Sequence, residues 1–397
     1  MDGTRPVAVR PLDLRLAAQL EQLRAADLYR TRRIVDGGHG AGIVVEGRAC
    51  VNFCSNDYLG LAGDARIAAA ASKALSNGVG SGASALVSGY NREHALLEEA
   101  LAEYVQRPRA LLFSSGWAAN LGVLRALLGK GDTLIADELN HASLIDGGRL
   151  AGANALRVPH GDVAAFAQAL AAPRRGQTLL ATDSLFSMDG DLAPLAELSQ
   201  LCSAHEAALL VDDAHGFGVL GDGRGALFAQ GAAPLAADIY MAGFGKALGT
   251  AGAFVAGSEA LIEFLIQRAR TFVFSTAPPP ALAAATRASL ALIAGDEGGA
   301  RRAHLSALIA RFRKGCAQQG ITLAPSATAI QPLLLGAEAR ALAASQALFG
   351  QGYWVAAIRP PTVPPGTARL RITLTAAHTE AEVDGLVEAL HRALQTA

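Results

Sequence analysis

Between Arg109 and Gly257, short β-prone runs alternate with segments rich in alanine and leucine. The β-prone runs are ALLF, DTLIA, ALRV, TLLAT, ALLVD, DIYMA and AFVAG. Segments of helical character lie between them, for example Trp117–Leu128 and Ala142–Leu150. Strands that alternate with helices form a mostly parallel sheet that is covered by helices on both faces. The middle of the chain is therefore predicted to be an α/β domain.

The segments outside this region have different patterns. Leu12–Arg33 has leucines at helical spacing among charged residues, which predicts an amphipathic helical arm. The three prolines of FSTAPPP interrupt the alternation, and a long helical region is expected from there to about Gln319. The remainder predicts strands AIQPLLL, WVAAI and ARLRITL with helices at Arg340–Phe349 and Glu380–Leu394. This order is typical of a small α+β domain.

These patterns divide the chain into three parts. Residues 1–50 are expected to form the helical arm and the start of the small domain, residues 51–277 the large α/β domain, and residues 278–397 the small C-terminal α+β domain. A chain of 397 residues with 51% apolar residues has enough material for two cores.

Composition argues against several classes of partner. The formal charge of -1 comes from 34 basic and 35 acidic residues without long runs, so neither nucleic acid nor an acidic membrane is expected to bind. The N-terminal stretch MDGTRPVAVRPLDL lacks the apolar core of a signal peptide, and apolar segments are interrupted before the roughly 18 residues needed to span a bilayer. The 4 cysteines match neither a disulfide framework nor a zinc site. We expect a cytoplasmic protein without a metal.

Two motifs in the α/β region carry reactive groups. ALLVDDAHGFG is a buried strand that ends in Asp212, Asp213 and His215, and ligands of α/β folds bind at the carboxyl ends of strands. DIYMAGFGKALGTAG places Lys246 among glycines, which let a bulky group approach the backbone. Such a lysine predicts a nucleophile that forms a Schiff base when its amine is neutral. In the alternative interpretation, the acid and the histidine cap a turn and the lysine is solvated.

Two nucleotide-binding interpretations do not fit their context. Gly216, Gly218 and Gly221 have G-x-G-x-x-G spacing after a strand, but the following GDGRG consists of turn residues, whereas a dinucleotide fingerprint opens a helix. GFGKAL lacks the first glycine of a phosphate-binding Walker loop and the hydroxyl after its lysine. Neither segment predicts a nucleotide site.

Two further elements follow strands. FSSGWAAN predicts a strand, then Ser114, Ser115 and Gly116, then a helix whose free N–H groups face an anion such as phosphate. An ordinary serine N-cap explains the same letters. His141 in LNHASL also follows a strand, where its planar ring suits stacking on an aromatic cofactor, although a single histidine is more often structural.

The chain thus has, in order, a possible phosphate site at FSSGWAAN, a loop histidine at His141, Asp212 and His215 after a strand, and Lys246 among glycines. These four elements resemble those of the fold-type I pyridoxal phosphate enzymes, and more narrowly those of the α-oxoamine synthases. The segments that are similar are NFCSNDYLGL, GSGASALVSGY, FSSGWAAN, NHASL, DSLFSMDGDLAPL, VDDAHGFGVLG, FGKALG, FSTAPPP and AIRPPTVPPGTARLRITLTAAH. Together they extend over nearly the whole chain. The resemblance implies the fold-type I transferase fold, with a mostly parallel central sheet covered by helices, a smaller α+β C-terminal domain and an N-terminal helical arm.

The resemblance also implies pyridoxal 5'-phosphate as cofactor and a set of residues around it. Lys246 would carry the cofactor as a Schiff base and later remove the α-proton of the amino acid, and Asp212 would face the pyridine nitrogen. The other implied contacts are His141 stacked on the ring, His215 and Ser187 near the phenolic oxygen, the backbone N–H groups of Gly116 and Trp117 on the phosphate, and Thr276 reaching the phosphate of the neighbouring subunit. The last contact requires a homodimer.

For the substrate, the resemblance assigns the carboxylate of the amino acid to Arg359 and associates Asn52 and Arg30 with substrate binding. The guanidinium fork of an arginine suits a carboxylate, and the prolines of AIRPPTVPP restrict where Arg359 points. Arg30 is expected to lie in the predicted N-terminal helix. Two positions depart from the family pattern. Gly243 replaces a threonine or serine that contacts the phosphate, and Ala85 replaces an arginine or histidine.

The last of the similar segments most closely resembles the branch of the family that acts in biotin biosynthesis. That branch condenses L-alanine with a pimeloyl thioester, carried by coenzyme A or by an acyl carrier protein, and releases carbon dioxide. A second interpretation is a sister synthase that uses glycine with acetyl- or succinyl-CoA, or serine with a fatty acyl-CoA. A third is a non-catalytic subunit that keeps the fold as a scaffold, against which the presence of Lys246 and Asp212 argues.

Overall fold

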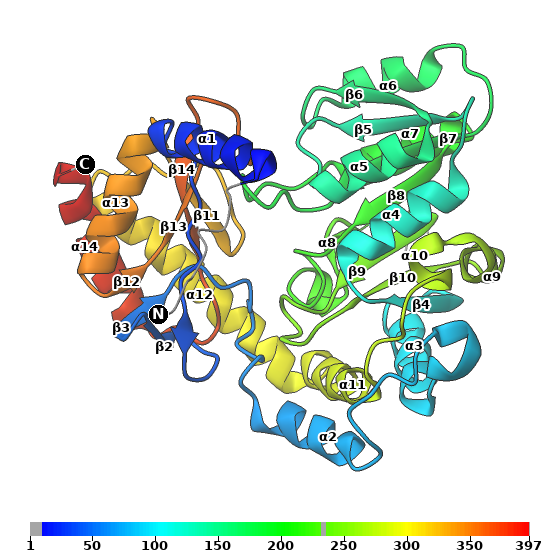
Figure 1. Ribbon diagram of the computed structural model, residues 1–397, viewed down its shortest axis with the longest axis horizontal. Helices are drawn as coiled ribbons and strands as arrows, with labels where there is room; N and C mark the ends of the chain where they lie inside the picture. Colours follow the sequence, from blue (N-terminus) through cyan, green and yellow to red (C-terminus); the bar gives the residue numbers. More distant parts are fainter. Residues whose placement is uncertain (1–9, 232–235, 397) are drawn as a thin grey trace, which may run out of the picture.

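The computed structural model describes residues 10–231 and 236–396, so the first nine residues of the N-terminal stretch lie outside it. Within this part of the chain, the strands form three sheets (Figure 1). The largest has the order β4-β10-β9-β8-β7-β5-β6, and it is parallel except for β10, which is antiparallel to both of its neighbours. Its strands are β4 (Arg109–Phe113), β5 (Thr133–Asp137), β6 (Asn154–Val158), β7 (Thr178–Asp183), β8 (Ala208–Asp212), β9 (Ile239–Gly243) and β10 (Ala253–Gly257). The predicted mostly parallel α/β sheet is confirmed.

Helices cover both faces of this sheet. Successive strand residues point to opposite sides, so apolar strands present an apolar face on each side that helices bury. Leu111 and Phe113 face one layer of helices, while Ala110 and Leu112 face the other. The first layer contains α4 (Gly116–Leu127), α5 (Ala142–Ala151), α9 (Glu259–Arg268) and α10 (Arg270–Val273). The second layer contains α3 (Arg92–Tyr104), α6 (Val163–Ala171), α7 (Leu195–Ala204) and the short α8 (Ala226–Ala229). Two buried apolar cores thus hold the sheet between the layers.

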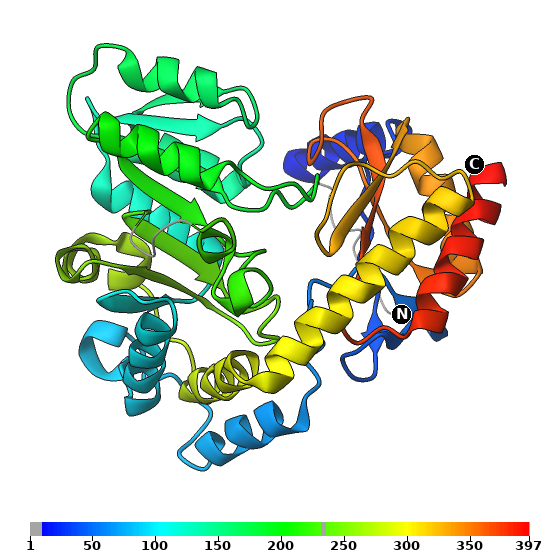
Figure 2. The same cartoon turned by 180° about the vertical axis from the view of Figure 1, so that it is seen from behind.

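The two smaller sheets belong to the second body of the molecule. One is antiparallel, with the order β11-β14-β13, and the other has the order β1-β2-β3-β12. Their strands are β1 (Val35–Asp36), β2 (Gly42–Val45), β3 (Arg48–Asn52), β11 (Ile330–Gly336), β12 (Tyr353–Trp354), β13 (Ala356–Ile358) and β14 (Ala368–Thr373). The helices α12 (Asp296–Gln318), α13 (Glu338–Gly350) and α14 (Glu380–Thr396) pack with them. Figure 2 shows α12 as the long helix that enters this body from α11.

Between the two bodies, α11 (Pro280–Ala294) packs against α2 (Ala65–Leu75) and α3. Two short elements complete the chain, the π-helix η1 (Ala85–Gly89) and the 3-10 helix η2 (Gly221–Gly223). The predicted domain limits at residues 50 and 277 stay a prediction.

The predicted N-terminal helix was wrong in extent, and the predicted helical region after FSTAPPP is confirmed but divided. The N-terminal helix is α1 (Pro11–Ala25) and does not continue to Arg33, because the backbone at Asp27 takes the left-handed conformation (φ 56°), which ends a helix. Arg30 is consequently outside any helix. The long helical region after FSTAPPP is two helices, because extended backbone at Gly295 separates α11 from α12.

The segment WVAAI was predicted as one strand and is divided between two sheets. Trp354 belongs to β12 and pairs with β3, while Ala356–Ile358 forms β13 and pairs with β14. Val355 between them is fully buried. A packed side chain therefore fixes the point at which the chain changes sheets.

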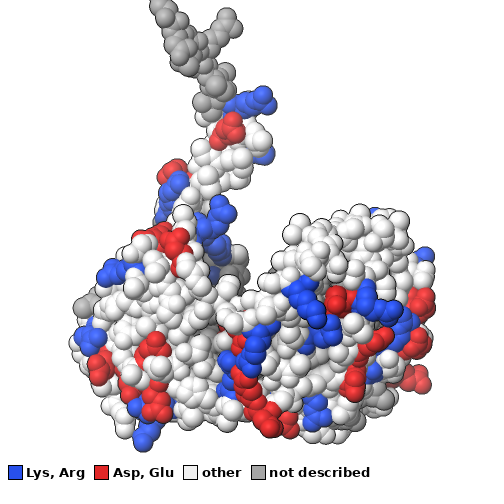
Figure 3. All heavy atoms as spheres, turned by 90° about the horizontal axis from the view of Figure 1, so that it is seen from below, with Lys and Arg blue, Asp and Glu red and all other residues white. Residues whose placement is uncertain are grey.

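The surface agrees with the balanced composition. On the face shown in Figure 3, basic and acidic side chains lie close to one another and form no broad field of one sign. Among the described residues, no helix is both long and apolar enough to cross a membrane.

Candidate active site

Five parallel strands bring the predicted cofactor residues to one edge of the large sheet. Gly116, His141, Ser187, His215 and Lys246 each follow the last residue of their strand, β4, β5, β7, β8 and β9 respectively, by three or four positions. The carboxyl ends of parallel strands share one edge, which is where α/β folds bind ligands. The residues come from separate stretches of sequence, and the strand order brings them together.

Asp212 is the last residue of β8, and its carboxylate is held in one orientation. Its Oδ2 accepts a hydrogen bond of 2.7 Å from Nδ2 of Asn120, and its Oδ1 accepts one of 3.0 Å from the backbone N–H of Ala214. Asn120 lies on α4, is fully buried, and also donates to the Ser143 hydroxyl at 2.8 Å. Asn120 was not among the residues predicted from the sequence. Its place inside an otherwise apolar helix face was the available signal, because a buried amide requires a partner.

Lys246 lies close to a pair of acidic side chains. In the register of the sheet, Asp212 of β8 stands beside Asp183 of β7. Burial and the neighbouring Asp212 raise the pKa of Asp183 well above its usual range. Burial lowers the pKa of Lys246, while Asp212 and Asp183 oppose that shift. The amine is therefore easier to deprotonate than a lysine in water, as a nucleophile or base requires.

Asp213, which follows Asp212, has a buried carboxylate with a different set of hydrogen-bond partners. Its Oδ2 accepts hydrogen bonds from the Tyr240 hydroxyl at 2.7 Å and from the Ala226 N–H at 2.9 Å, and its Oδ1 accepts one from the Ser184 hydroxyl. Burial raises the pKa of this carboxyl to about 6. A Cβ at Gly216 or Gly225 would overlap its oxygens. The glycine-rich run after β8 thus wraps around a buried carboxylate, which explains its glycines without a dinucleotide.

The two predicted histidines differ in burial but both lie within electrostatic reach of the amine. His215 is buried, and its Nδ1 is 2.5 Å from the Tyr58 hydroxyl. His141 is the N-cap of α5, and its ring is exposed. Its Nδ1 is bonded to Ser143 at 2.7 Å, and Trp117 packs edge-on at 5.9 Å. Burial lowers the pKa of both rings, and Lys246 contributes to the shift in each case. Both imidazoles are neutral at pH 7.

The start of α4 combines both interpretations of FSSGWAAN. Ser115 is the N-cap, since its hydroxyl accepts a hydrogen bond of 3.1 Å from the Ala118 N–H. The N–H groups of Gly116 and Trp117 donate to no described residue. Free N–H groups at the start of a three-turn helix favour an anion. The cap therefore leaves two donors for a phosphate.

Arg371 is the charged residue of this site that the sequence analysis missed. It lies on β14 of the second body, where only 6% of its surface is exposed. Its Nε donates to the Ser187 carbonyl at 2.5 Å, and its Nη1 donates to the Asn56 side chain at 3.0 Å. Its positive charge acts on both Lys246 and His215. Its Nη2 is buried and has no partner among the described residues. The sequence signal for Arg371 was the presence of two arginines in the strand segment ARLRIT, because arginine is rarely buried unless it has a charged or polar partner.

Arg359, which was predicted from the sequence to bind the substrate carboxylate, donates hydrogen bonds to backbone carbonyls. Arg359 donates from Nη1 to the Asp27 carbonyl and from Nη2 to the Tyr29 carbonyl at 3.4 Å. Arg30 is within 3.5 Å of the Pro360 carbonyl and of the Thr362 hydroxyl. Both arginines therefore tie the segment after α1 to the loop that follows β13. Asn52 ends β3, and its Oδ1 accepts a hydrogen bond from the Cys54 N–H at 2.9 Å.

The remaining predicted positions lie at the surface or have free space. Thr276 is exposed and pairs with Ser84, the residue before η1, in an isolated bridge. Ala85 is the first residue of η1. At Gly243 a Cβ would have no neighbour closer than 3.9 Å, so the structure has room for a side chain there.

These residues fit pyridoxal phosphate. The fit rests on groups that lack partners within the described chain, namely the N–H groups of Gly116 and Trp117 and Nη2 of Arg371, and on the partly exposed His141. The Lys246 amine also forms no hydrogen bond or ion pair with a described residue. An amine, a carboxylate, an open aromatic face and an anion site are the features that such a cofactor uses.

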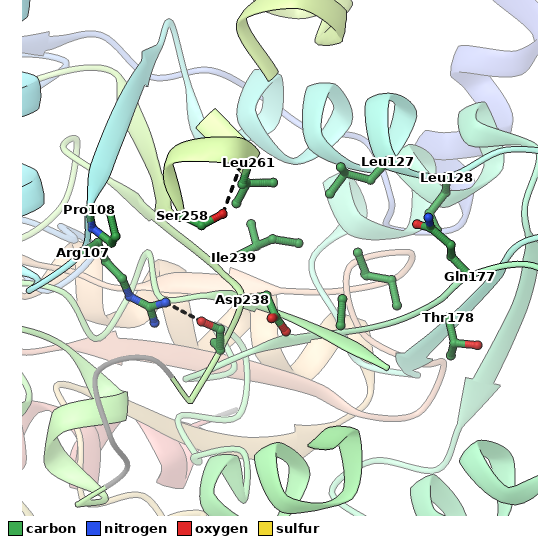
Figure 4. A pocket seen from close by; sticks show the side chains of 13 residues that line it. Arg107, Pro108, Leu127, Leu128, Gln177, Thr178, Asp238, Ile239, Ser258 and Leu261 are labelled. Carbon is green, nitrogen blue, oxygen red and sulfur yellow. Dashed lines mark hydrogen bonds between the residues drawn. The ribbon is translucent and has the colours of Figure 1, made fainter. Parts of the chain in front are cut away.

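A cavity of about 360 Å³ lies at the opposite edge of the same sheet (Figure 4). It is lined by residues at or near the amino ends of strands, including Thr178 of β7, Ala208 of β8 and Ile239 of β9, and by Arg107 and Leu261. No predicted cofactor or substrate residue lines it. The site defined by the side chains therefore lies away from this hollow.

Comparisons with known proteins agree with the fold. Residues 48–390 match the sequence profile described as aminotransferase class I and II. The 8-amino-7-oxononanoate synthase of Thioalkalivibrio sulfidiphilus is 54% identical over 383 residues, 96% of this chain and 97% of that protein. A serine palmitoyltransferase from S. paucimobilis, solved with bound pyridoxal phosphate and myriocin, is 28% identical, with a TM-score of 0.91 over 98% of this chain and 99% of that one. The 8-amino-7-oxononanoate synthase of Francisella tularensis is 29% identical, with a TM-score of 0.76 over 87% of this chain and 98% of that one.

Proposed function

Because this chain belongs to the aminotransferase class I and II family and, within it, to the 8-amino-7-oxononanoate synthases, we propose that it condenses L-alanine with a pimeloyl thioester. The products are 8-amino-7-oxononanoate, carbon dioxide and the free thiol carrier, and the pathway is biotin biosynthesis. The cofactor is pyridoxal phosphate. The interpretation as a scaffold without activity has no support, since the amine and the carboxylate that the chemistry needs lie together.

Pyridoxal phosphate supplies an electron sink that stabilises negative charge at the α-carbon of an amino acid. The residues of this chain hold the cofactor and move protons around it. Lys246 is the attachment point and the base, because its lowered pKa makes the neutral amine accessible. Asp212, fixed by Asn120, would hold the ring nitrogen of the bound cofactor in its protonated form. The free N–H groups of Gly116 and Trp117 bind the phosphate.

The histidines and Ser187 complete the proposed cofactor site. His141 stacks on the ring, for which its exposed face is available. His215 lies at the phenolic oxygen, where its neutral ring and the Tyr58 hydroxyl provide a hydrogen-bonding pair. Ser187 lies near the same oxygen, and its backbone carbonyl holds Arg371 in place.

We assign the carboxylate of L-alanine to Arg371. A buried guanidinium with a partnerless nitrogen carries a large desolvation cost unless an anion pairs with it. Arg30, in the segment after α1, contacts the loop after β13 that carries Arg359, and we propose that both arginines act on the substrate, together with Asn52 of β3.

A homodimer is part of the proposal, with Thr276 reaching the phosphate in the partner subunit. Large apolar side chains are exposed on the elements around Thr276 and the start of α4: Leu86 and Val87 of η1, Trp117 of α4, and Phe274 after α10. A contiguous apolar surface of this kind marks an interface. We propose that the enzyme works in the cytoplasm and accepts its acyl group from coenzyme A or an acyl carrier protein.

The observation that carries this function is the place of Lys246 beside the Asp183–Asp212 pair at the carboxyl edge of the sheet. The experiment is incubation of the purified enzyme with L-alanine and pimeloyl-CoA or pimeloyl-carrier protein, followed by mass spectrometry. The expected product is 8-amino-7-oxononanoate. Product only from glycine with acetyl- or succinyl-CoA, or only from serine with palmitoyl-CoA, would refute the assignment in favour of a sister synthase.

A further inference from the structure

The turn at residues 186–191, called here the Ser187 turn, lies between the two bodies of the protein. Its Ser187 carbonyl accepts from Arg371, and Asp189 forms an ion pair with Arg369 at 2.5 Å. The Gly190 carbonyl accepts from the hydroxyls of Ser326 at 2.8 Å and Thr328 at 3.1 Å. All these partners belong to the small body. The Ser187 turn therefore supplies the contact that holds the Nε side of the Arg371 guanidinium, while Asn56 and Thr373 hold Nη1.

On its other side, the Ser187 turn is held by a single ring. Nε2 of His160 is 2.8 Å from Oδ2 of Asp191. Nδ1 of His160 is 3.0 and 3.1 Å from the two carboxylate oxygens of Asp137. Asp137 is the last residue of β5 and is 1% exposed, and it also accepts from the N–H groups of Leu139 and Gly161 at 2.8 Å. The ring of Phe186 packs edge-on against the imidazole at 4.3 Å. His160 thus joins the turn to the end of a central strand.

The geometry determines the protonation state of this ring. A carboxylate oxygen only accepts hydrogen bonds, and both nitrogens of His160 face carboxylates. A neutral imidazole has one N–H and satisfies one of them, whereas an imidazolium satisfies both. The hydrogen bonds with Asp137 and Asp191 raise the pKa of His160 to about 10, in agreement with this argument. A further acidic residue beside it is Glu138, whose Oε1 accepts a hydrogen bond from the backbone N–H of His160 at 3.2 Å.

From these contacts we propose that His160 is a positioning residue for the amino acid substrate. As an imidazolium at neutral pH, it fixes the Ser187 turn to β5, and through the Ser187 carbonyl it helps to fix the guanidinium of Arg371. This inference rests on the proposed function in that Arg371 holds the carboxylate of L-alanine. Loss of the ring charge frees the turn and weakens alanine binding, while the base and the electron sink keep their places. His160 itself touches neither cofactor nor substrate.

One test needs no substrate and no variant enzyme beyond a reference for assignment. In the holoenzyme with ¹⁵N-labelled histidine, NMR at pH 8 distinguishes a ring with two protonated nitrogens from a neutral tautomer. The proposal expects one imidazolium signal at pH 8, absent from the spectrum of His160→Gln. A neutral ring for His160 at pH 8 would overturn it.

The second test separates positioning from mere stability. In His160→Gln the amide donates to one carboxylate at most, and we expect KM for L-alanine to rise about tenfold to a hundredfold while kcat changes less than about threefold. Asp191→Asn, which keeps a polar side chain of the same size, moves KM in the same direction by less. The matched control is His391→Gln on α14, where the ring forms a hydrogen bond with Gln395 of its own helix.

The outcomes are distinct. A lowered melting temperature with unchanged KM in both variants would show a purely structural role and overturn the proposal, as would a fall in kcat alone. If His160→Gln does not fold, Asp191→Asn and the ring signal still decide the matter. If the wild-type enzyme gives no product, the proposed function fails, and the imidazolium signal remains as a separate result.

Discussion

Oδ2 of Asp212 and Nδ2 of Asn120 are 2.7 Å apart, although the two residues are 92 positions apart in the sequence. This contact joins the end of β8 to the buried face of α4. It holds one carboxylate oxygen in a fixed direction, and the hydrogen bonds of this carboxylate within the described chain come from neutral donors. A carboxylate held in this way is suited to pair with a protonated pyridine ring.

Substitution of Asn120 tests this relationship. Asn120→Leu keeps the volume but removes the donor, and hydrogen bonds to charged groups contribute about 1.5–3 kcal/mol. We expect kcat for 8-amino-7-oxononanoate formation to fall by about tenfold or more, with the cofactor absorbance retained. Steady-state kinetics and an absorption spectrum measure both. Asn154→Ala at the exposed start of β6 is the control, and equal effects of the two substitutions would contradict the assignment.

The attachment point is tested by Lys246→Ala. The variant should lose turnover entirely, because both the attachment point and the base are removed. In the wild-type protein, borohydride reduction followed by peptide mapping should place the tag on the peptide that contains Lys246. The exposed Lys130 provides the control Lys130→Ala, which should retain tag and activity. A tag on any other peptide would refute the site.

Two arginine variants decide which guanidinium holds the carboxylate of alanine. Arg371→Lys keeps the charge but loses the fork geometry, and we expect KM for L-alanine to rise by about tenfold or more. Arg359→Lys should change KM for alanine less, because its nitrogens are already bonded to backbone carbonyls of Asp27 and Tyr29. The reverse order of effects would return the role to Arg359.

Gly243→Ser adds the hydroxyl that the resemblance to the α-oxoamine synthases implies at this position. The space around Gly243 is sufficient, since a Cβ there has no neighbour closer than 3.9 Å, and the backbone is not left-handed. We expect tighter cofactor binding, by about 0.5–1.5 kcal/mol for one added hydrogen bond. Dialysis against buffer without pyridoxal phosphate, followed by fluorescence titration, measures the Kd. Weaker binding would show that the hydroxyl does not reach the phosphate.

The pKa of His160 predicts a pH dependence of stability. Its pKa is raised from 6.5 to about 10 in the folded protein, so the folded state binds this proton more tightly than the unfolded chain. The resulting stabilisation is fully present below about pH 6.5 and is lost as the pH rises through about 10. The difference in free energy of unfolding between wild type and His160→Gln should therefore be largest near pH 6 and shrink above pH 10. Urea denaturation at both values tests this, and a constant difference would contradict it.

The sequence by itself determined the α/β sheet and the residues that follow its strands. Lys246, Asp212, His141 and His215 could be found because each lies within four positions of the end of its own strand, so local patterns place them at the functional edge. The end of α1 could not be found, because the left-handed backbone at Asp27 is a single-residue choice with no periodic signal.

Only the tertiary structure decided which distant side chains complete the site. Asn120 donates a hydrogen bond to Asp212, and Arg371 donates one to the Ser187 turn, 184 positions away. The ring of His160 is hydrogen-bonded to both Asp137 and Asp191. Each of these contacts depends on strand order and on the packing of the two bodies. Periodicity reports which face of an element is buried, but it carries no information on which other element that face will meet. The partners of a buried charge are therefore set by the fold as a whole.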